Sequence, residues 1–383
     1  MKVVVLGTRG FPNIQGGVET HCAELYPRLV AAGCDVTVIG RAPYTGKAPY
    51  EYEGVKIIPL ACPKNKFLEA VWHTFCGVLK ARQIGCDVLH IHAIGPALFV
   101  PLARLLGMNV VMTHHGPDYD RKKWNAVAKG VLKLGERLGV KFANHVITVS
   151  KAIAAMVYQK YGREVTAIPN GVVIFPRAVG RHVLSRYNVE QSKYILAVGR
   201  FVPEKGFDEL LQSFQQFSAK NQDGWKLVIA GDADHDDDFS RKFKQDCRNT
   251  SDVVLTGFIK GRELRELYSH AALFVLPSYH EGLPIVLLEA LSYGASCLVS
   301  DIPANREVCL EKDRYFKPGD IPTMTRKLHQ YLDNFSEDSM DRQGMINYIR
   351  ETYNWDHIAE QTLGLYQQSA SFSRAEKAET YPV

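Results

Sequence analysis

The chain has 383 residues, of which 46% are hydrophobic and 23% are charged, and its formal net charge is +5. At about 100–200 residues per domain this length predicts two domains, and the composition excludes a disordered chain or a small disulfide scaffold. No apolar stretch reaches the roughly 18 residues of a membrane span. The apolar run from Val3 to Leu6 is too short for a secretory signal, so we expect it to be a first strand.

Charge and cysteine usage indicate the partners and the compartment. Residues 1–185 contain 23 Lys and Arg against 11 Asp and Glu, whereas the rest of the chain contains 23 against 30. The first half is therefore expected to favour an anionic partner or surface. The eight cysteines are scattered without metal-ligand spacing, which is typical of reduced thiols in a reducing compartment. We expect a cytoplasmic protein.

Strand-length apolar runs alternate with helix-length segments along the first half of the chain. Gly33 stops the first of these helices, and Ser150 is a favourable N-cap for the last. Such alternation implies a parallel, doubly wound sheet with crossover helices. The expected strands are 3–6, 35–39, 87–92, 109–113 and 145–149, and the expected earlier helices are 18–32, 66–82, 97–106 and 124–141.

A turn signal at Ile168–Val172 separates this alternation from a second one. After a linker that ends near residue 193, the pattern of strands and helices restarts, with a helix from about Phe207. We therefore predict an α/β protein with Rossmann-like domains at 1–185 and 186–354, and a flexible polar tail at 370–383. The expected strands of the second domain are 194–198, 225–230, 253–256, 273–276 and 296–299.

The segment Tyr279–Ala290 carries two carboxylates after a buried strand. Glu281 precedes a helix expected to reach Leu298, and the unpaired N–H groups of its first turn attract phosphate. Because this helix is apolar almost all round, Glu289 is costly to bury unless it is paired or binds a polar ligand. The arrangement suits a phosphorylated, polyhydroxylated ligand. The alternative is that Arg306 pairs with Glu289 while Glu281 is solvated.

A glycine-flanked basic loop, Gly199–Gly206, directly follows the strand at 194–198. Arg200 offers a planar fork of donors and Lys205 a mobile point charge, and together they suit a diphosphate. An ordinary basic surface loop is the alternative.

Two loops of the first half are also candidates. Gly16 and Gly17 stand immediately before a helix and resemble a phosphate-facing nest. The loop from Gly7 lacks the Gly-x-Gly-x-x-Gly spacing, which disfavours a nicotinamide-dependent dehydrogenase, and it fits no P-loop. His114 and His115 lie at the carboxyl end of a strand, where open α/β sheets place ligand contacts, although structural histidines are the alternative.

Taken together, Gly16–Glu19, Gly199–Gly206 and the glutamates Glu281 and Glu289 resemble glycosyltransferase family 4 over nearly the whole chain. This is a retaining family with the GT-B fold, in which two Rossmann-like domains face each other across a cleft. The resemblance implies a nucleotide-sugar-dependent glycosyltransferase of the hexosyltransferase type. It also implies an N-terminal acceptor domain, a C-terminal donor domain and a helix at about 355–370 that crosses back to the first.

At matching positions, the resemblance implies that Arg200 and Lys205 hold the donor diphosphate and stabilise the leaving charge. Glu281 would bind the sugar hydroxyls, and Glu289 would bind the nucleotide ribose. Three neighbours would assist Glu281 through their backbone: Gly282, Leu283 and Ile285.

The resemblance assigns the remaining contacts to the first half. Gly16 and Gly17 would approach the phosphates by backbone, and His115 would lie near the sugar 6-position and the reacting centre, with His114 as the alternative. Catalysis is then mostly electrostatic and requires no metal or other cofactor. We accordingly interpret the acidic run at 232–238 as a solvated loop and not as a metal site.

Basic amphipathic segments at 64–82 and 127–141 suit an anionic membrane surface. The alternative is that each is a helix with its apolar face on the core and its basic face in solvent, which gives the same pattern. We expect a glycan or lipid-diphosphate-linked acceptor and peripheral association with the inner face of the membrane. Nucleic acid is disfavoured, since no base-stacking aromatic platform accompanies the charge. The candidates on this acceptor or membrane side are His114, Arg121, Lys122, Lys123 and Trp124.

The stretch from His114 to Trp124 also resembles bacterial surface-polysaccharide transferases, including rhamnosyltransferase-like members. Bacterial polysaccharide biosynthesis is therefore the expected setting, and UDP-, GDP- and dTDP-sugars are all candidate donors. Two alternatives stay open: a nucleotide-sugar 2-epimerase of the same fold, and a non-catalytic sugar-nucleotide-binding subunit.

Overall fold

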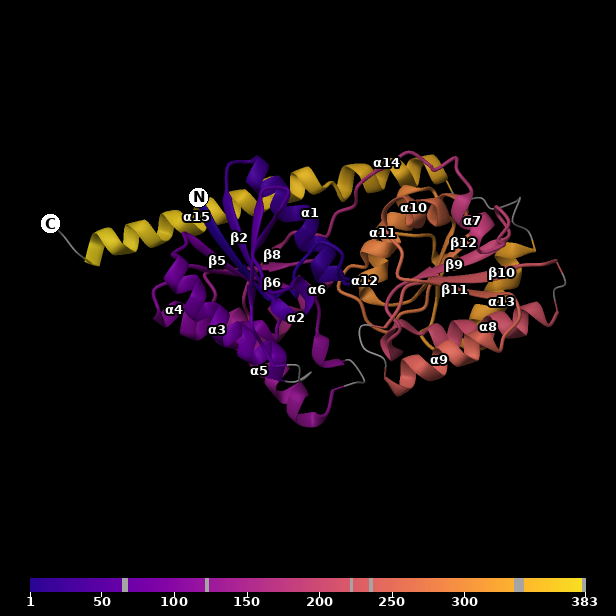
Figure 1. Ribbon diagram of the computed structural model, residues 1–383, viewed down its shortest axis with the longest axis horizontal. Coiled ribbons are helices and arrows are strands. Elements are labelled where there is room, and N and C mark those ends of the chain that lie inside the picture. Colours follow the sequence, from indigo (N-terminus) through magenta and orange to yellow (C-terminus); the bar gives the residue numbers. More distant parts are fainter. Residues whose placement is uncertain (64–67, 121–123, 221–222, 234–236, 334–340, 381–383) are drawn as a thin grey trace. The chain divides into compact units, whose positions relative to one another are not determined.

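The computed structural model describes residues 1–63, 68–120, 124–220, 223–233, 237–333 and 341–380, with side chains up to residue 370. It divides the chain into two α/β units (Figure 1). Unit 1 consists of Met1–Asn170 and Trp355–Val383, and unit 2 of Gly171–Asn354. Within the described residues, none of the helices combines the length and the apolar character needed to cross a bilayer.

Unit 2 begins earlier than the boundary at residue 185 that the sequence suggested. The reason is that the expected linker already packs within unit 2. Val172 forms a parallel bridge with Asn354, and its N–H donates to the carbonyl oxygen of Tyr353 over 2.9 Å. Further along, the N–H of Ala178 donates to Ser269 Oγ over 2.9 Å. The chain thus enters and leaves unit 2 at neighbouring points.

Unit 1 contains an eight-stranded sheet in the order β3-β4-β2-β1-β5-β6-β7-β8, parallel except for the β3–β4 hairpin. Helices α1 and α15 cover one face, while α3, α4 and α5 cover the other (Figure 1). Its strands are β1 (Lys2–Leu6), β2 (Asp35–Arg41), β3 (Tyr50–Tyr52), β4 (Val55–Leu60), β5 (Val88–His92), β6 (Val110–His114), β7 (His145–Thr148) and β8 (Thr166–Ala167). Its helices are α1 (Gly17–Ala31), α2 (Ala42–Thr45), α3 (Leu68–Ile84), η1 (Pro96–Phe99), α4 (Val100–Leu105), η2 (Asp118–Asp120), α5 (Ala126–Phe142), α6 (Lys151–Tyr161) and α15 (Trp355–Thr380).

Unit 2 contains a six-stranded, wholly parallel sheet in the order β11-β10-β9-β12-β13-β14. Helices α8, α9 and α13 cover one face, and α7, α10, α11 and α14 the other (Figure 1). Its strands are β9 (Tyr194–Val198), β10 (Lys226–Ala230), β11 (Val253–Gly257), β12 (Leu273–Leu276), β13 (Cys297–Ser300) and β14 (Tyr315–Phe316). Its helices are α7 (His182–Arg186), η3 (Pro203–Lys205), α8 (Phe207–Ser218), α9 (Asp238–Arg248), α10 (Gly261–His270), α11 (Ile285–Ser292), α12 (Pro303–Arg306), η4 (Lys312–Arg314), α13 (Ile321–Leu332) and α14 (Arg342–Thr352).

The prediction of two doubly wound parallel sheets is confirmed, but two helix ends differ from it. The helix expected to reach Leu298 ends at Ser292, because Gly294 takes a left-handed φ of +67° and strand β13 then begins at Cys297. Helix α15 starts in the expected place, at Trp355, and continues to Thr380, into the segment expected to be a flexible tail.

The strand order fixes where ligands can bind. In unit 1, β1 has β2 on one side and β5 on the other, and in unit 2, β9 lies between β10 and β12. The chain therefore leaves β1 and β5, or β9 and β12, in opposite directions, which opens a crevice at the carboxyl ends of these strands. The loops after β1, β9 and β12 contain the glycine, arginine and glutamate motifs predicted from the sequence.

Candidate active site

In unit 2, the loops that follow β9 and β12 are in direct contact. Gly206 has φ +68°, and a Cβ atom there would collide with the carbonyl oxygen of Pro277. The N–H of Tyr279 donates to the carbonyl oxygen of Glu204 over 2.9 Å. Only glycine satisfies both the left-handed φ and this close approach. The glycine of the predicted basic loop therefore brings that loop against the loop that carries Glu281.

Lys205 and Glu281 form an ion pair between these two loops. Lys205 Nζ lies 2.6 Å from Glu281 Oε1, and the two side chains are 14% and 13% exposed. Ser278 Oγ donates to the same carboxylate oxygen over 2.6 Å. Tyr279 Oη donates to Glu209 Oε1, and burial followed by that hydrogen bond raises the pKa of Tyr279 to about 12. The structure thus brings together two residues that the sequence predicted for one ligand.

Glu289 lies in the second turn of α11 and accepts a 2.9 Å hydrogen bond from Tyr268 Oη. Burial, and then the Glu289 carboxylate, raise the pKa of Tyr268 well above its usual value. Arg306, the expected structural partner of Glu289, instead pairs with Asp301 at 2.5 Å. The remaining members of the predicted donor loop lie just before or at the start of α11: Gly282 half-buried, and Leu283 and Ile285 buried.

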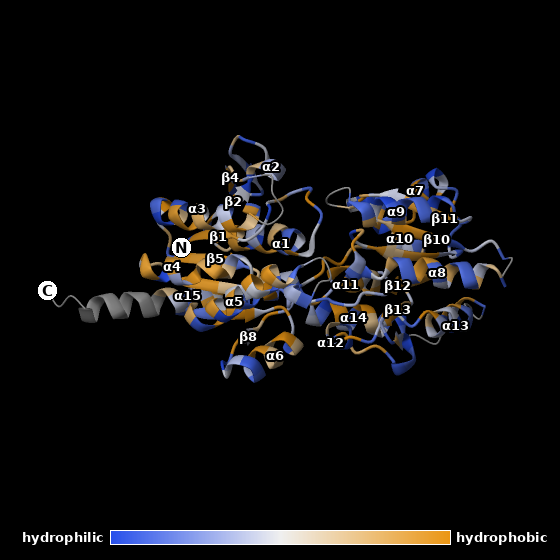
Figure 2. Cartoon of the chain, turned by 90° about the horizontal axis from the view of Figure 1, so that it is seen from below, coloured by the Kyte–Doolittle hydropathy of each residue, from blue (hydrophilic) through white to orange (hydrophobic). Residues whose placement is uncertain are grey.

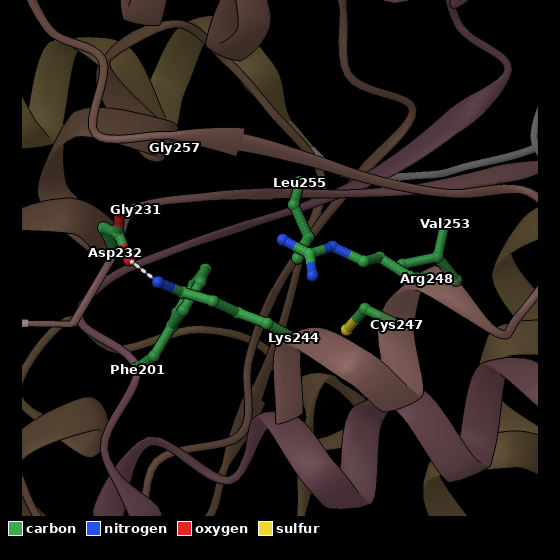
Figure 3. A pocket seen from close by; sticks show the side chains of 9 residues that line it. All are labelled: Phe201, Gly231, Asp232, Lys244, Cys247, Arg248, Val253, Leu255 and Gly257. Carbon is green, nitrogen blue, oxygen red and sulfur yellow. Dashed lines mark ion pairs between the residues drawn. The ribbon is translucent and has the colours of Figure 1, made fainter. Parts of the chain in front are cut away.

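Arg200 is half-buried at the carboxyl end of β9, and the next residue, Phe201, lines a pocket of about 350 Å³ (Figure 3). The pocket lies between α9 and the length of β11, from Val253 to Gly257, and it reaches the carboxyl end of β10 at Gly231. Arg248 from α9 extends along its wall in the close view (Figure 3). One end of the pocket, at Phe201 and Gly231, therefore reaches the sheet edge that carries the two contacting loops.

The pocket was not predicted from the sequence, and it lies beside the acidic run. Asp232 of this run is 42% exposed, as expected for a solvated loop, and its Oδ1 also pairs with Lys244 Nζ at 2.6 Å across the pocket (Figure 3). Asp237 is the N-cap of α9, where its side chain accepts from the N–H of Ser240. Residues 234–236 of the run lie outside the described residues. A capping-box pattern, Asp237 followed three residues later by Ser240, was the available signal.

In unit 1, the predicted glycine pair has two different structural roles. Gly16 is the N-cap of α1, and a Cβ there would collide with the carboxylate of Glu19. That carboxylate is held by Arg9, whose Nε lies 3.1 Å from Glu19 Oε1. By contrast, a Cβ on Gly17 would meet nothing within 4 Å among the described residues. Gly16 is thus constrained by internal packing, while Gly17 has open space beside it at the first turn of α1.

His115 follows β6 and belongs to a cluster of histidines. Its Nε2 shares a 2.9 Å hydrogen bond with His92 Nδ1 at the end of β5, and its ring meets that of His21 from α1 edge-on. Burial lowers the pKa of His21 to about 4, and it lowers the pKa of His92 and His115 well below their usual value, as does the charge repulsion among the rings. These rings are therefore neutral near pH 7. The His90–x–His92 alternation in a strand next to β6 was the signal that the sequence offered for this cluster.

The side chain of His114 is completely buried, whereas that of His115 is only half-buried. The N–H of Gly116 donates to its Nδ1 over 3.1 Å, so its Nε2 carries the proton and donates to Glu136 Oε1 over 2.9 Å. Although burial opposes ionisation, hydrogen bonds from His114, Lys160 and Tyr161 lower the pKa of Glu136 to about 2. With both ring nitrogens engaged, His114 serves the core of unit 1, which corrects its placement on the acceptor side.

The other acceptor-side candidates are only partly visible. Arg121, Lys122 and Lys123 lie outside the described residues, and Trp124 is half-buried just before α5. On α5 itself, Val127 is 76% and Leu134 48% exposed, so the helix does not turn its whole apolar face to the core.

Comparison with known proteins agrees with this architecture. The family model described as Glycosyltransferase Family 4 matches residues 15–174, and the one described as Glycosyl transferases group 1 matches residues 185–352. The chain is 27% identical to an alpha-maltose-1-phosphate synthase of Mycolicibacterium smegmatis over 96% of this chain and 99% of that protein.

Solved structures show the same fold. Sucrose-phosphate synthase of Thermosynechococcus elongatus superposes with a TM-score of 0.81 at 19% identity, over 96% of this chain and 98% of that one. HepE of Anabaena, in complex with UDP-glucose, superposes with a TM-score of 0.78 at 16% identity, over 96% and 100% of the two chains. The family matches fall on the two units in turn, and both units have the expected parallel sheets. The chain therefore belongs to the family 4 and group 1 glycosyltransferases, and it is a glycosyltransferase with the GT-B fold.

Proposed function

We propose that the chain transfers a sugar from a nucleoside diphosphate to a glycan or lipid-linked glycan, with retention of the anomeric configuration, in bacterial polysaccharide biosynthesis. The observation that carries the proposal is the Lys205–Glu281 pair at the switch point of unit 2. A cation and a carboxylate held side by side suit a ligand with a diphosphate next to a polyhydroxylated ring.

The donor is proposed to lie along the carboxyl edge of the unit 2 sheet. Arg200 and Lys205 neutralise the diphosphate as it leaves, Glu281 binds the sugar hydroxyls, and Glu289 binds the ribose. The pocket beside Phe201 takes the nucleoside base, since it combines an aromatic side chain with the polar groups of Asp232 and Lys244. HepE, of the same fold, is described as a complex with UDP-glucose, which supports a nucleotide-sugar donor.

Unit 1 is proposed to supply Gly17, through its backbone, and His115, through its ring, to the reaction. Retention follows if the acceptor attacks the sugar on the face that the diphosphate leaves, so that no protein nucleophile is needed. Rate enhancement then comes from positioning and from the cations on the leaving group. We propose that this step uses no metal ion or other cofactor.

The acceptor is proposed to be presented at an anionic membrane surface. Helix α4 packs against both α3 and α5, so the three helices form one surface. Many residues of α3 and α4 are hydrophobic (Figure 2). Trp72 on α3 is 52% exposed and Leu105 on α4 is 86% exposed. Lys133 and Arg137 extend from the exposed side of α5. Exposed apolar side chains beside cations suit an anionic bilayer, and they support the proposal of peripheral association with the inner face of the membrane.

The test is donor binding and turnover across UDP-, GDP- and dTDP-sugars, with Glu281→Ala and Lys205→Ala as site variants. We expect one nucleotide class to bind and to turn over, with both variants losing turnover, and the transferred sugar to keep its anomeric configuration. An inverted product contradicts retention, and a 2-epimerised nucleotide sugar supports the epimerase. Donor binding without any turnover supports the non-catalytic subunit instead.

A further inference from the structure

Three histidines of unit 1 converge from separate elements. His21 lies on α1, His92 ends β5 and His115 follows β6. One ring nitrogen of each lies within 4.8 Å of those of the other two. The ring centroids are 5.0 to 5.4 Å apart. His21 and His92 are buried, and His115 is half-buried, so the group has one side that is accessible.

The hydrogen bonds around this group leave the lone pair of His21 Nε2 directed inward. His21 Nδ1 donates to Asn170 Oδ1 over 2.9 Å, which fixes the tautomer in which Nε2 is unprotonated. That Nε2 atom is buried and has no hydrogen-bond partner among the described residues. His92 Nε2 is bonded to Tyr26 Oη at 2.5 Å, and His92 Nδ1 shares a 2.9 Å hydrogen bond with His115 Nε2. One proton lies between these two atoms, and the ring that carries it would change tautomer when an ion binds. Metal-binding histidines are held in this way, with the outer nitrogen bonded to a protein oxygen.

A cluster of neutral histidines that serves packing alone explains this arrangement less well. A buried polar atom without a partner costs about 1–3 kcal/mol, and His21 is only 3% exposed. A phenylalanine at that position would remove the unpartnered atom but would also lose the hydrogen bond to Asn170. The unpartnered nitrogen instead points to a ligand that accepts its lone pair.

We propose that His21, His92 and His115 bind a divalent transition-metal ion of the Zn²⁺ class. Three imidazoles with a fourth, open position form a known zinc ligand set, with Zn–N distances of about 2.0–2.1 Å. The three nitrogens already lie within 4.8 Å of one another, and the rings would rotate to close on one ion. Nitrogen donors select Zn²⁺, Co²⁺, Ni²⁺ or Cu²⁺ over Mg²⁺ and Ca²⁺, which prefer oxygen.

The site would regulate the transfer and would not take part in it. An ion on His115 removes that ring from the donor sugar, so a bound metal inhibits the enzyme; this consequence rests on the proposed function, whereas metal binding itself does not. The two are separable, because binding is measured on the full chain without any donor.

The experiment titrates the full chain with Co²⁺ and records the visible d–d absorption, followed by competition with Zn²⁺. We expect one equivalent of Co²⁺ to give the bands of a four- or five-coordinate ion, which Zn²⁺ abolishes and Mg²⁺ does not. His21→Phe keeps the ring and removes the ligand, so the bands disappear, whereas His145→Phe, at the start of β7, leaves them unchanged.

Two further variants keep the test decisive if His21→Phe folds poorly. His115→Phe changes the half-buried ligand and is expected to lose the bands as well. Asn170→Leu leaves all three ligands in place and is expected to weaken Zn²⁺ binding by about 10- to 100-fold, as loss of an outer hydrogen bond does. Absence of d–d bands in the wild type, or bands that persist in both His→Phe variants, overturns the proposal.

Discussion

The Nζ atom of Lys205 lies 2.6 Å from Oε1 of Glu281, although 76 residues separate them in the chain. Both side chains come from loops at the switch point of the unit 2 sheet, and both are largely buried. The pair is therefore preorganised before any ligand arrives. A donor diphosphate would draw the ammonium group toward itself and leave the carboxylate for the sugar.

Lys205→Ala is expected to lower kcat by at least about 100-fold, because it removes a cation that stabilises the leaving diphosphate. Lys205→Arg keeps the charge with a different geometry, so its kcat should lie between those of the wild type and Lys205→Ala. Steady-state transfer kinetics measure this, with Lys312→Ala as the control, since Lys312 is an exposed lysine of the same unit. Equal loss in Lys205→Ala and Lys312→Ala would contradict the assignment.

Gly206→Ala is expected to destabilise unit 2 by clearly more than the roughly 1–2 kcal/mol of a left-handed residue, because its Cβ also collides with the Pro277 carbonyl. Gly224→Ala is the matched control: its φ is +72°, but a Cβ there meets nothing within 4 Å among the described residues. Urea unfolding of both variants gives the comparison. If the two free energies of unfolding drop equally, the loop contact contributes nothing.

His114→Phe and His115→Phe are expected to separate stability from catalysis. The first leaves the buried Glu136 carboxylate without one of its donors and should lower the free energy of unfolding by about 1–3 kcal/mol. The second leaves the buried His92 Nδ1 without its partner, so it should also lower stability, but it alone should reduce turnover. Thermal unfolding and transfer assays on the two proteins decide this, and the reverse outcome would move the reacting-centre role to His114.

Stability should fall as the pH drops below about 6.5. The pKa of His21 is lowered from 6.5 to about 4 in the folded chain, so the unfolded state takes up the proton first. The stability that neutral His21 contributes is therefore complete above pH 6.5 and is lost as the pH falls toward 4, at up to about 1.4 kcal/mol per pH unit. Urea unfolding between pH 7.5 and 5 measures the slope. In His21→Phe the slope should be shallower, and an unchanged slope would refute the attribution.

Trp72→Ser combined with Leu134→Ser is expected to abolish binding to vesicles that contain anionic lipid, with no loss of stability, because both side chains are exposed. Phe258→Ser, at an exposed position of unit 2, serves as the control. Cosedimentation with anionic and with zwitterionic vesicles, at low and high salt, separates the apolar from the electrostatic contribution. Binding that survives the double substitution would exclude this surface.

The sheets were predictable because their strands are uniformly apolar. Val3 to Leu6 and Leu273 to Leu276 are fully buried, as continuous hydrophobic runs in parallel sheets are. The β3–β4 hairpin was not predicted, since Tyr50–Tyr52 is short and only half covered and its turn relies on positive φ at Glu53 and Gly54. Whether such a short segment pairs as a strand depends on its neighbouring strand, which the hydrophobic periodicity of the sequence does not reveal.

The candidate site was predictable where one loop carries the motif and not where several elements meet. The sequence indicated Glu281, Glu289 and Lys205 individually, and the contact between Lys205 and Glu281 came from the fold. The histidine cluster needs α1, β5 and β6 to be adjacent, and a lone His21 in a helix gives no sign of this. In the same way, Lys244 lines the pocket only because α9 packs beside β10 and β11.

The backbone bridge between Val172 and Asn354 holds the entry and the exit of unit 2 next to each other. An exchange of Gly171–Asn354 for the matching segment of another family member would therefore need only two neighbouring junctions. Under the proposed function, recombination at these junctions would bring in a new donor-binding half and leave the acceptor half intact. Diversity among surface polysaccharides would then arise by shuffling whole donor modules as well as by point changes in a pocket.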